Sequence, residues 1–390
     1  MKILIYDTIY SKHLFSFLKI ISAYLGKSDK YSEIHIILNH QFLKENHIFL
    51  DQISVDKRFI INSLPRHVEN KILNTNYIFL KSIFEINHII SYSRFNKINS
   101  VLFLYIDYFQ ISLGVMSFLF LGVNIKLYGI LFETYVYRSV KSRKFWTSWL
   151  QVKFMLLNMA LKKIFILNDD RVVCKLNYHT KLSKFNVIPD PVYNPNFLKL
   201  DFRKLNNFSE RDFIFLVLGR INPRKNVLRL VEAFENLQDE IFEKSKLVVC
   251  GSFDDLKYKN ILLSKVSIKS KGHIFFLDNH LDDAMFDSAI YQSNCVCTIY
   301  DNFYGSSGIV GKAALANKIV LSSNMGTIGY IVDKYNLGVT VEPTSVKSIS
   351  EGMSRIINNG ETISRDSKSI HYCINNSETK FSEKIFGYIN

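Results

Sequence analysis

The sequence predicts an α/β protein made of two doubly wound domains that face each other across a cleft. Short runs rich in Ile, Val and Phe alternate with helical stretches, which is typical of parallel sheets covered by helices on both faces. The 390 residues exceed one compact core and suit two domains. Three of the six prolines fall in "VIPDPVYNP" (187–195), where an extended segment is expected to separate the halves.

The first half begins with an apolar run, residues 2–7, followed by a helix expected from about Lys12 to Leu25. A long helix is expected between the last two strands of this half. The strands expected in this half are 2–7, 33–38, 59–61, 100–106, 124–131 and 163–168. Together they predict a parallel sheet in an N-terminal domain, residues 1–195.

The second half repeats the pattern after the prolines. Its expected strands are 213–218, 246–250, 274–277, 295–300 and 318–323, each followed by a polar turn and usually a helix. This predicts a C-terminal domain, residues 196–372. Phe381, Ile385 and Tyr388 share one helical face, so residues 373–390 are expected to form a last helix that packs on either domain.

Charge is distributed unevenly along the chain. Residues 1–200 hold 26 Lys and Arg against 13 Asp and Glu, whereas residues 201–390 hold 23 against 22. Such asymmetry predicts that the N-terminal half faces a polyanion or an anionic membrane. Nucleic acid is the rival partner, but no recognition motif is present, so no nucleic acid is expected.

The five cysteines are odd in number and scattered, which favours a reducing compartment over a disulfide framework. Cys295 and Cys297 share one strand face, but their spacing matches no common zinc pattern, so structural thiols are expected. The first apolar run is cut by Asp7 and is too short for a signal peptide. Residues 111–125 are apolar yet shorter than a membrane span, and a buried helix running into a buried strand is expected there.

A basic and aromatic segment lies at 138–163, and no Asp or Glu occurs between Glu133 and Asp169. Both tryptophans of the chain are here, Trp146 and Trp149. We expect this segment to lie on an anionic bilayer, although a helix with core aromatics and solvated cations would have the same composition. The cations are Arg138, Lys141, Arg143, Lys144, Lys153, Lys162 and Lys163.

The stretch "GRINPRKN" (219–226) places cations at a strand-to-helix corner. Gly219 permits a tight turn after the strand 213–218, and an amphipathic helix is expected to begin near Arg224. Cations at a helix start oppose the helix dipole, and an anionic ligand would remove that conflict. Arg220 would offer a planar fork and Lys225 a point charge; a solvated basic turn is the alternative.

A second corner, "FYGSSGIVGKAALANK" (303–318), follows the strand 295–300. Its glycines let a backbone approach a ligand, and serine hydroxyls with backbone amides bind phosphate oxygens. Two such corners at the carboxyl ends of strands in one sheet favour a bound anion. No P-loop, GxGxxG or DxD pattern is present, so the anion is expected to be neutralised by protein cations with no metal or other cofactor. The loop residues are Gly305, Ser306, Ser307 and Gly308.

These residues, in this order, resemble the C-terminal half of family 4 glycosyltransferases (glycosyl transferases group 1), which have the GT-B fold of two facing Rossmann-like domains. The matching stretches are "FLVLGRINPRKNVLRLVEAF" (215–234), "KLVVCGSFDD" (246–255), "YGSSGIVGKAALANKIVLSSNMGTIGYI" (304–331) and "NLGVTVEP" (336–343). The resemblance covers roughly residues 160–360. It implies metal-independent transfer of a sugar from a nucleotide diphosphate donor, with retention at the anomeric carbon.

In such enzymes the cations at the positions of Arg220 and Lys225 clamp the donor diphosphate. The family usually has two glutamates separated by seven intervening residues around this loop, and here Tyr304 and Lys312 occupy their positions. Lys312 is then expected to reach a phosphate, and either Asp301 or the hydroxyls of Ser306 and Ser307 to meet the sugar. The resemblance therefore implies an intact phosphate site beside a rewritten sugar site.

The acceptor side carries no motif. His13 follows the first strand and Glu133 follows a later one, so both are candidates to contact an acceptor hydroxyl. Composition and resemblance together predict a hexosyl transferase that extends a lipid-linked glycan in bacterial capsule or lipopolysaccharide synthesis, held at the cytoplasmic face of the plasma membrane. A sugar-nucleotide 2-epimerase and a degenerate transferase kept as a binding partner are the alternatives.

Overall fold

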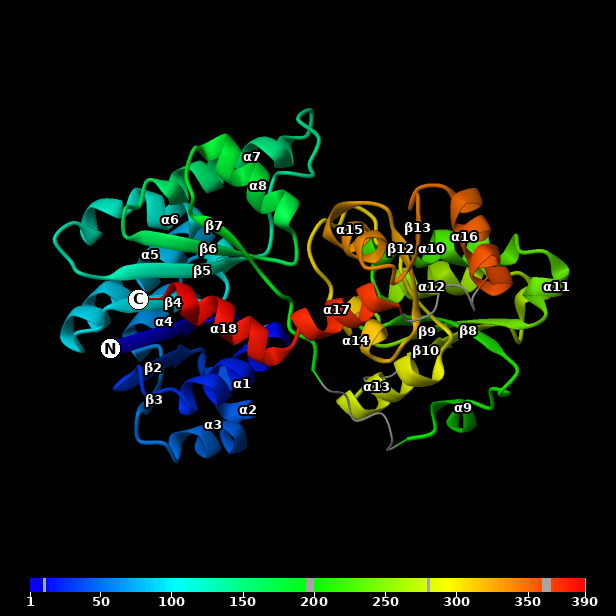
Figure 1. Cartoon of the computed structure of the whole chain (residues 1–390), viewed down its shortest axis with the longest axis horizontal. Coiled ribbons are helices and arrows are strands. Elements are labelled where there is room, and N and C mark those ends of the chain that lie inside the picture. The colour runs from blue at the N-terminus through cyan, green and yellow to red at the C-terminus, as the bar shows by residue number, and fades with distance from the viewer. Residues whose placement is uncertain (10–11, 194–199, 279–280, 360–365, 390) are drawn as a thin grey trace. The chain divides into compact units, whose positions relative to one another are not determined.

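The computed structural model describes residues 1–9, 12–193, 200–278, 281–359 and 366–389, apart from the side chains of residues 12 and 13. The chain divides into two compact units, residues 1–188 with 378–390, and residues 189–377. The sequence led us to expect boundaries after residues 195 and 372. Each unit holds one parallel sheet between helical layers, so the predicted class of two doubly wound domains is confirmed (Figure 1).

The sheet of the first unit has the order β3-β2-β1-β4-β5-β6-β7, and every described strand pair in it is parallel. Its strands are β1 (Lys2–Asp7), β2 (Glu33–Leu38), β3 (Phe59–Ser63), β4 (Ser100–Phe103), β5 (Lys126–Leu131), β6 (Leu161–Leu167) and β7 (Phe185–Ile188). The helices are α1 (Lys12–Gly26), α2 (His40–Glu45), α3 (His47–Ser54), α4 (Arg66–Leu73), α5 (Ile78–Phe95), α6 (Gln110–Val115), α7 (Arg143–Leu156), α8 (Asp170–Thr180) and α18 (Glu378–Tyr388), with 3-10 turns η1 (Ile106–Phe109) and η2 (Ser117–Phe120).

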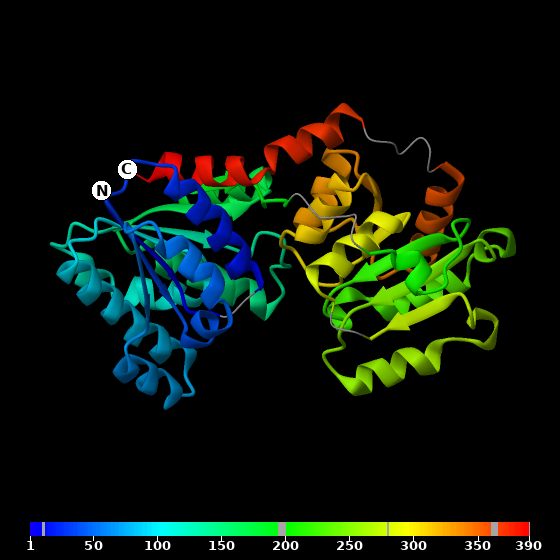
Figure 2. The same ribbon diagram turned by 90° about the horizontal axis from the view of Figure 1, so that it is seen from below.

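Alternation along β1 sends side chains to both faces of this sheet. Leu4 and Tyr6 belong to a core shared with α5, α6, α7 and α8. The last helix of the chain, α18, packs on α1, where the rings of Phe17 and Phe381 lie 4.9 Å apart. The Nζ of Lys30 donates to the carbonyl of Ile389 at 2.6 Å, so the two chain ends lie close together (Figure 2).

The segment 111–125 differs from the expected buried helix and strand. It forms the short α6 and the turn η2, and β5 begins only at Lys126. Ile111, Val115 and Phe118 are exposed because the short elements cannot bury every side of an apolar run. Among the described residues, no helix is long and apolar enough to cross a membrane.

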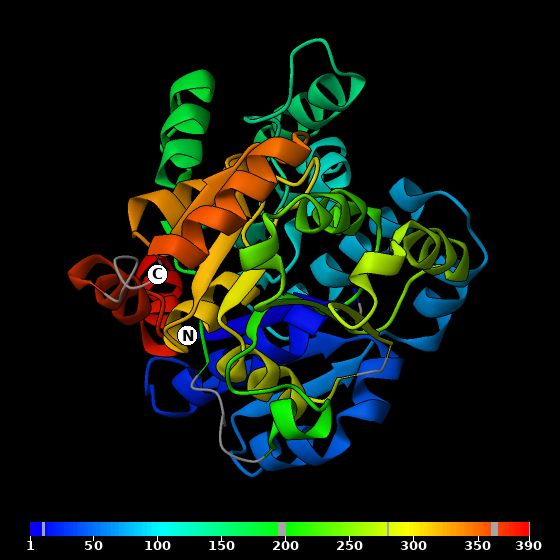
Figure 3. The ribbon, with the colours of Figure 1, turned by 90° about the vertical axis from the view of Figure 1, so that its right-hand side faces the viewer.

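The sheet of the second unit has the order β10-β9-β8-β11-β12-β13 and is also parallel. The elements of this unit run from green to red in Figure 3. Its strands are β8 (Phe213–Leu218), β9 (Ser245–Cys250), β10 (Ile274–Leu277), β11 (Cys295–Thr298), β12 (Ile319–Ser323) and β13 (Gly338–Val341). The helices are α9 (Phe202–Leu205), α10 (Val227–Glu235), α11 (Asp239–Phe242), α12 (Leu256–Lys265), α13 (Asp283–Gln292), α14 (Gly308–Leu315), α15 (Gly326–Lys334), α16 (Val346–Asn359) and α17 (Ser367–Asn375), with turns η3 (Pro223–Lys225) and η4 (Ile268–Ser270).

Strand β8 again feeds two cores. Phe215 and Val217 pack with α10, α12 and α16, whereas Ile214, Leu216 and Leu218 pack with α13, α14, α15 and α17. Helices therefore cover both faces of the sheet, and the positions open to a ligand lie at the amino and carboxyl ends of its strands.

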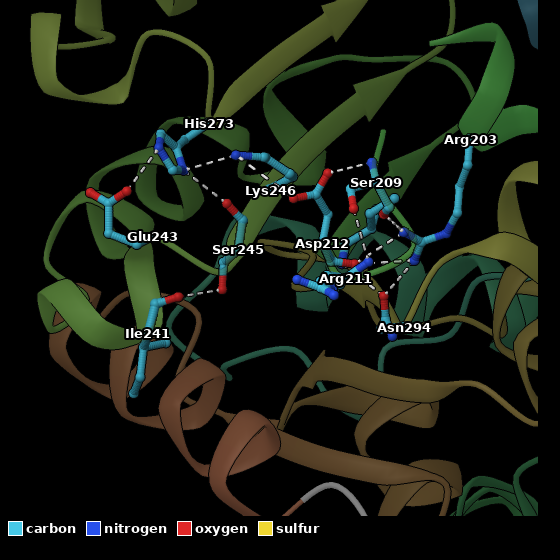
Figure 4. Close-up of polar contacts among 11 residues, drawn as sticks. Arg203, Ser209, Arg211, Asp212, Ile241, Glu243, Ser245, Lys246, His273 and Asn294 are labelled. Carbon is cyan, nitrogen blue, oxygen red and sulfur yellow. Dashed lines mark hydrogen bonds and ion pairs between the residues drawn. The ribbon is translucent and has the colours of Figure 1, made fainter. Parts of the chain in front are cut away.

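The amino edge of this sheet is closed by a polar network (Figure 4). Arg203, only 7% exposed, donates to the carbonyls of Gln292, Ser209 and Asp212 and to the side chain of Asn294. Its guanidinium thus joins the segments that enter β8 and β11. This edge is structural, which leaves the carboxyl edge for function.

Candidate functional site

The two predicted corners meet at the point where the strand order of the second sheet reverses. The chain runs from β8 outward through β9 to β10 and then returns to β11, on the other side of β8. Residues 219–226 follow β8 and residues 299–308 follow β11, so both loops leave the same edge at neighbouring strands. Open α/β sheets bind their ligands at such a switch point.

The corner after β8 is a tight backbone turn. Gly219 has φ +86°, and its N–H donates to the carbonyl of Cys250 at 3.0 Å. Gly251, at φ +137°, lies so close that a Cβ on it would be 2.2 Å from the Gly219 carbonyl oxygen. Glycine at 251 is therefore required for the close approach of these two strand ends, and glycine at 219 for the positive φ of the turn.

The α-helix after this corner begins later than expected. Residues 223–225 form the 3-10 turn η3, Asn226 is left-handed at φ +58°, and α10 begins at Val227. The side chain of Asn226 donates to the carbonyl of Pro343 at 2.7 Å, and this bond holds the left-handed residue in place. Arg224 and Lys225 therefore precede the first turn of α10 and do not lie within it, and they remain at the positive end of its dipole.

Lys225 is a buried cation, with only 5% of the residue exposed. Its Nζ donates to the carbonyl of Leu218, lies 3.4 Å from the Tyr300 hydroxyl and sits 5.0 Å above the centre of that ring. No Asp or Glu among the described residues forms an ion pair with it. A buried ammonium without a carboxylate is costly, and an anionic ligand would supply the missing charge.

Arg220 has a different environment. Its side chain is 75% exposed, and its Nε donates to Asp254, which also accepts a bond from the side chain of Asn222 at 3.0 Å. Solvent and a carboxylate already satisfy this guanidinium. Of the two cations that the sequence predicts to bind an anion, Lys225 would therefore be stabilised more by one, because it is buried and Arg220 is exposed and paired.

Tyr300 connects Lys225 to the Gly-Ser loop. It follows β11 and is 2% exposed. Burial alone would raise the pKa of its hydroxyl, but the charge of Lys225 and a hydrogen bond with Ser307 together hold the pKa below its usual range. The sequence offered no signal for this residue, because Tyr300 reads as the last apolar position of a strand.

The Gly-Ser loop is held from two sides. Ser306 donates to Asp190 at 2.7 Å, and the carbonyl of Tyr304 accepts bonds from the backbone and hydroxyl of Thr327 at 3.1 and 2.9 Å. Ser307 is the residue before α14 and makes no capping bond with its side chain. Ser307 also bonds with the Tyr300 hydroxyl, so the amides at the start of α14, which begins at Gly308, follow a residue that contacts Tyr300 and can receive an anion.

Lys312 is paired with a carboxylate on a neighbouring helix. Its Nζ lies 2.5 Å from Oδ1 of Asp287, a residue that is 6% exposed, and 4.9 Å from the ring centre of Phe286. Asp301 contacts Arg229 at 3.4 Å. Lys312, on α14, therefore has a carboxylate partner, and this partner is Asp287 on α13.

The acceptor-side candidates lie in the first unit. His13 falls in α1, but its side chain is outside the described residues. Glu133 follows β5; its carboxylate is 71% exposed and pairs with Arg138 at 2.9 Å. Its backbone N–H donates to Asp107 at 2.8 Å, so Glu133 is anchored by its backbone while its side chain reaches solvent.

The basic segment 138–163 is not one helix. Only residues 143–156 form α7, and Lys162 and Lys163 belong to β6. Trp146 and Leu150 are 54% and 50% exposed on α7. The adjacent α6 packs closely on α7, and glycine at 114 permits this contact because a Cβ there would lie 2.2 Å from the Phe154 carbonyl oxygen. Exposed aliphatic side chains also lie on α6.

The C-terminal part of the chain matches a family of known proteins. Residues 199–379 match the family described as Glycosyl transferases group 1. The lipopolysaccharide glucosyltransferase WaaG of Escherichia coli (strain K12) is 22% identical over 206 residues, which are 50% of this chain and 53% of that protein. An Escherichia coli UDP-Gal:alpha-D-GlcNAc-diphosphoundecaprenol alpha-1,3-galactosyltransferase is 27% identical over 141 residues, 34% of this chain and 35% of that protein.

The matches with solved structures extend over the whole chain. The WaaG crystal structure aligns with a TM-score of 0.68 at 12% identity, over 99% of this chain and 100% of that one. Anabaena HepE in complex with UDP aligns with a TM-score of 0.70 at 12% identity, over 100% and 98%. Residues 199–379 therefore match a glycosyl transferases group 1 domain, and the chain has the GT-B fold, as the resemblance implied.

Proposed function

We propose that the chain is a retaining glycosyltransferase that uses a nucleotide-diphosphate sugar, with Lys225 and the Gly-Ser loop binding the diphosphate. One observation carries the proposal: Lys225 is buried without a carboxylate partner among the described residues, and Tyr300, which it contacts, bonds with Ser307, the residue before α14. A diphosphate would meet both the ammonium and the amides. Arg220, which is exposed, would reach the ligand by leaving Asp254.

The chemistry follows from the charge of the leaving group. When the bond between the anomeric carbon and the diphosphate breaks, negative charge accumulates on the departing phosphate. A fixed ammonium stabilises that charge more in the transition state than in the ground state, by about 3 kcal/mol for one such contact. Lys225 is suited to this role because its hydrogen bond to Leu218 and its contact with Tyr300 fix the ammonium before the ligand arrives. With protein cations in this role, the reaction we propose needs no metal.

Relatives support the donor and acceptor classes. Anabaena HepE binds UDP and UDP-glucose, which makes a uridine donor carrying a hexose the first candidate. The similar Escherichia coli proteins act on lipopolysaccharide and on a diphosphoundecaprenol-linked sugar. The match with this chain spans about half the length of the first protein and a third of the second. From what these relatives act on, we propose a lipid-linked glycan acceptor in bacterial surface polysaccharide synthesis.

A lipid-linked acceptor agrees with the exposed surface of α6 and α7. Trp146, Leu150, Ile111 and Val115 are exposed, and the cations of residues 141–144 lie at the start of α7. Aromatic and aliphatic side chains beside cations are typical of peripheral contact with an anionic bilayer. We propose that this surface holds the protein at the cytoplasmic face of the plasma membrane.

Ligand binding is tested first by thermal shift with UDP, GDP, CDP and ADP. A ligand at 100 times its dissociation constant stabilises the folded state by about 2.7 kcal/mol, so at least one nucleotide should raise the melting temperature. Hydrolysis of the matching nucleotide sugar should fall about a hundredfold in Lys225→Ala. Lys347→Ala, which removes a lysine that is 87% exposed on α16, is the matched control. No response of the unaltered protein to any nucleotide would leave the degenerate transferase as the better description.

Membrane contact is tested by co-sedimentation with vesicles of phosphatidylglycerol and phosphatidylethanolamine. Replacing Lys141, Arg143 and Lys144 with Gln should weaken binding by about 1 kcal/mol per charge, or roughly a hundredfold together. The control removes three exposed cations from the second unit, Lys257, Lys265 and Lys271. Equal losses in the two triple variants would show that net charge, and not this surface, drives binding.

A further inference from the structure

Lys225, Tyr300 and Ser307 form a polar cluster at the carboxyl edge of the second sheet. An ammonium group can only donate hydrogen bonds, so the Lys225 Nζ donates to the carbonyl of Leu218 and, at 3.4 Å, to the oxygen of the Tyr300 hydroxyl. Ser307 bonds with the same hydroxyl. Lys225 is 5% exposed and Tyr300 2%, so the hydrogen atoms of these groups need acceptors in the protein or on a ligand.

The cluster carries more hydrogen atoms than the protein accepts. The ammonium has three, and the Leu218 carbonyl and the Tyr300 oxygen accept two of them. Each hydroxyl has one, and a single bond joins Tyr300 to Ser307. Whichever hydroxyl donates in that bond, the hydrogen of the other has no acceptor among the described residues. One ammonium hydrogen and one hydroxyl hydrogen are therefore left without a partner in the described part of the chain.

Aromatic packing fixes the Tyr300 ring beside Lys225. The guanidinium of Arg224 lies 4.9 Å from the centre of the Tyr300 ring and 4.5 Å from that of Phe303, and the two rings meet edge to face at 5.5 Å. The Lys225 ammonium lies 5.0 Å from the centre of the Tyr300 ring. These cation–π contacts involve the ring and not its hydroxyl. The ring should therefore keep its place when the hydroxyl is removed.

An anionic oxygen is the acceptor that suits the two remaining hydrogen atoms. A neutral acceptor would satisfy them but would leave the charge of the buried ammonium unbalanced. A phosphate oxygen carries negative charge, and hydrogen bonds to such an oxygen are stronger than those between neutral groups. The backbone amides at the start of α14, which follow Ser307, can bind other oxygens of the same phosphate.

We propose that the Tyr300 hydroxyl donates a hydrogen bond to a phosphate oxygen that Lys225 also binds, while Ser307 donates to the Tyr300 oxygen. The inference rests on the proposed function in one respect, since that function makes this oxygen part of the departing phosphate. When the bond to the anomeric carbon breaks, its electron pair goes to the phosphate oxygen, and the hydroxyl keeps its proton while its hydrogen bond strengthens. Phosphate binding itself needs only residues of the second unit.

The test is calorimetric titration of the full chain with two ligands. One is the diphosphate among UDP, GDP, CDP and ADP that gives the largest thermal shift, and the other is inorganic pyrophosphate. Tyr300→Phe keeps the ring and its contacts with both cations, so it should fold. It should raise both dissociation constants about tenfold to a hundredfold, the effect of one hydrogen bond to a charged oxygen. Tyr291→Phe, at a residue of α13 that is 43% exposed, is the matched control.

A double-mutant cycle with Lys225→Met separates direct contact with the ligand from an effect on the ammonium. A hydroxyl that donates to the ligand itself should still contribute without Lys225, so Tyr300→Phe should weaken binding in the Lys225→Met protein by a similar factor. A hydroxyl that only holds the ammonium should contribute nothing there. The second result, or a Tyr300→Phe protein that binds both ligands normally, would overturn the inference.

The two ligands also distinguish this inference from the proposed function. Pyrophosphate binding that depends on Tyr300, in a protein that binds no nucleoside diphosphate, would support the hydrogen bond and remove the proposed transferase. Nucleotide binding that depends on Lys225 but not on Tyr300 would leave the transferase and remove the hydrogen bond. A protein that binds neither ligand would overturn both.

Discussion

Replacing Lys225 with Met should separate ligand binding from folding. The substitution keeps the length of the side chain and removes a charge that is 5% exposed. Two effects on the free protein oppose each other. The Leu218 carbonyl loses its charged donor, at a cost of about 1–3 kcal/mol, while the desolvation penalty of an unpaired ammonium, several kcal/mol, disappears. Because the two effects have opposite signs and similar sizes, stability should change by less than either one alone, by about 2 kcal/mol at most.

Binding of a nucleoside diphosphate should change much more. Unit charges 4 Å apart attract by about 4 kcal/mol at an effective dielectric constant of 20, and part of this is spent on desolvating the ligand. A net loss of about 3 kcal/mol corresponds to a dissociation constant more than a hundredfold higher. Urea unfolding and calorimetric titration with the nucleotide found by thermal shift measure the two quantities. A Lys225→Met protein that binds normally, or whose lost binding follows a collapse in stability, would refute the role of Lys225.

Three further predictions concern the fold around the two edges. Gly251→Ala should lower the free energy of unfolding by about 3 kcal/mol and weaken nucleotide binding, because its Cβ would lie 2.2 Å from the Gly219 carbonyl oxygen at a φ that L-residues avoid; circular dichroism melts and titration check both effects. Arg203→Lys should cost about 3 kcal/mol in urea unfolding, since a lysine cannot satisfy the carbonyls that the guanidinium joins, whereas Arg211→Lys at an exposed position should cost almost nothing. Because the pKa of Asp7 is raised to about 8 by burial, the folded state binds more protons than the unfolded state, so stability should fall as pH rises from about 4 to 8; Asp7→Asn should flatten this slope, and an unchanged slope would contradict the assignment.

The sequence predicted the strands with strong local patterns. Residues 2–7, 33–38, 213–218 and 274–277 begin and end where expected, because a short run of mainly apolar residues bounded by polar ones is typical of a strand in a parallel sheet. The four-residue strands β7 and β13 were not among the predicted strands. Their runs, "FNVI" and "GVTV", are short and mix polar residues with apolar ones, so only pairing with β6 and β12 makes them strands.

The corner after β8 shows where local pattern stops being sufficient. Helical periodicity from Val227 onward predicts α10 correctly. The sequence predicts its start near Arg224, too early, because no local pattern indicates the left-handed Asn226. That conformation is held by the carbonyl of Pro343, more than a hundred residues away along the chain. Helix ends depend on such distant partners more than helix interiors do.

The sequence by itself determined the two α/β domains, the carboxyl-edge positions of both corners and the resemblance to a transferase, since these depend on residue order alone. Only the tertiary structure decided what each charged group faces. It buries Lys225 away from carboxylates, pairs Arg220 with Asp254, and buries Asp7 at the end of β1. The physical reason is that the energy of a charge depends on its burial and its partners, and these partners come from distant parts of the chain.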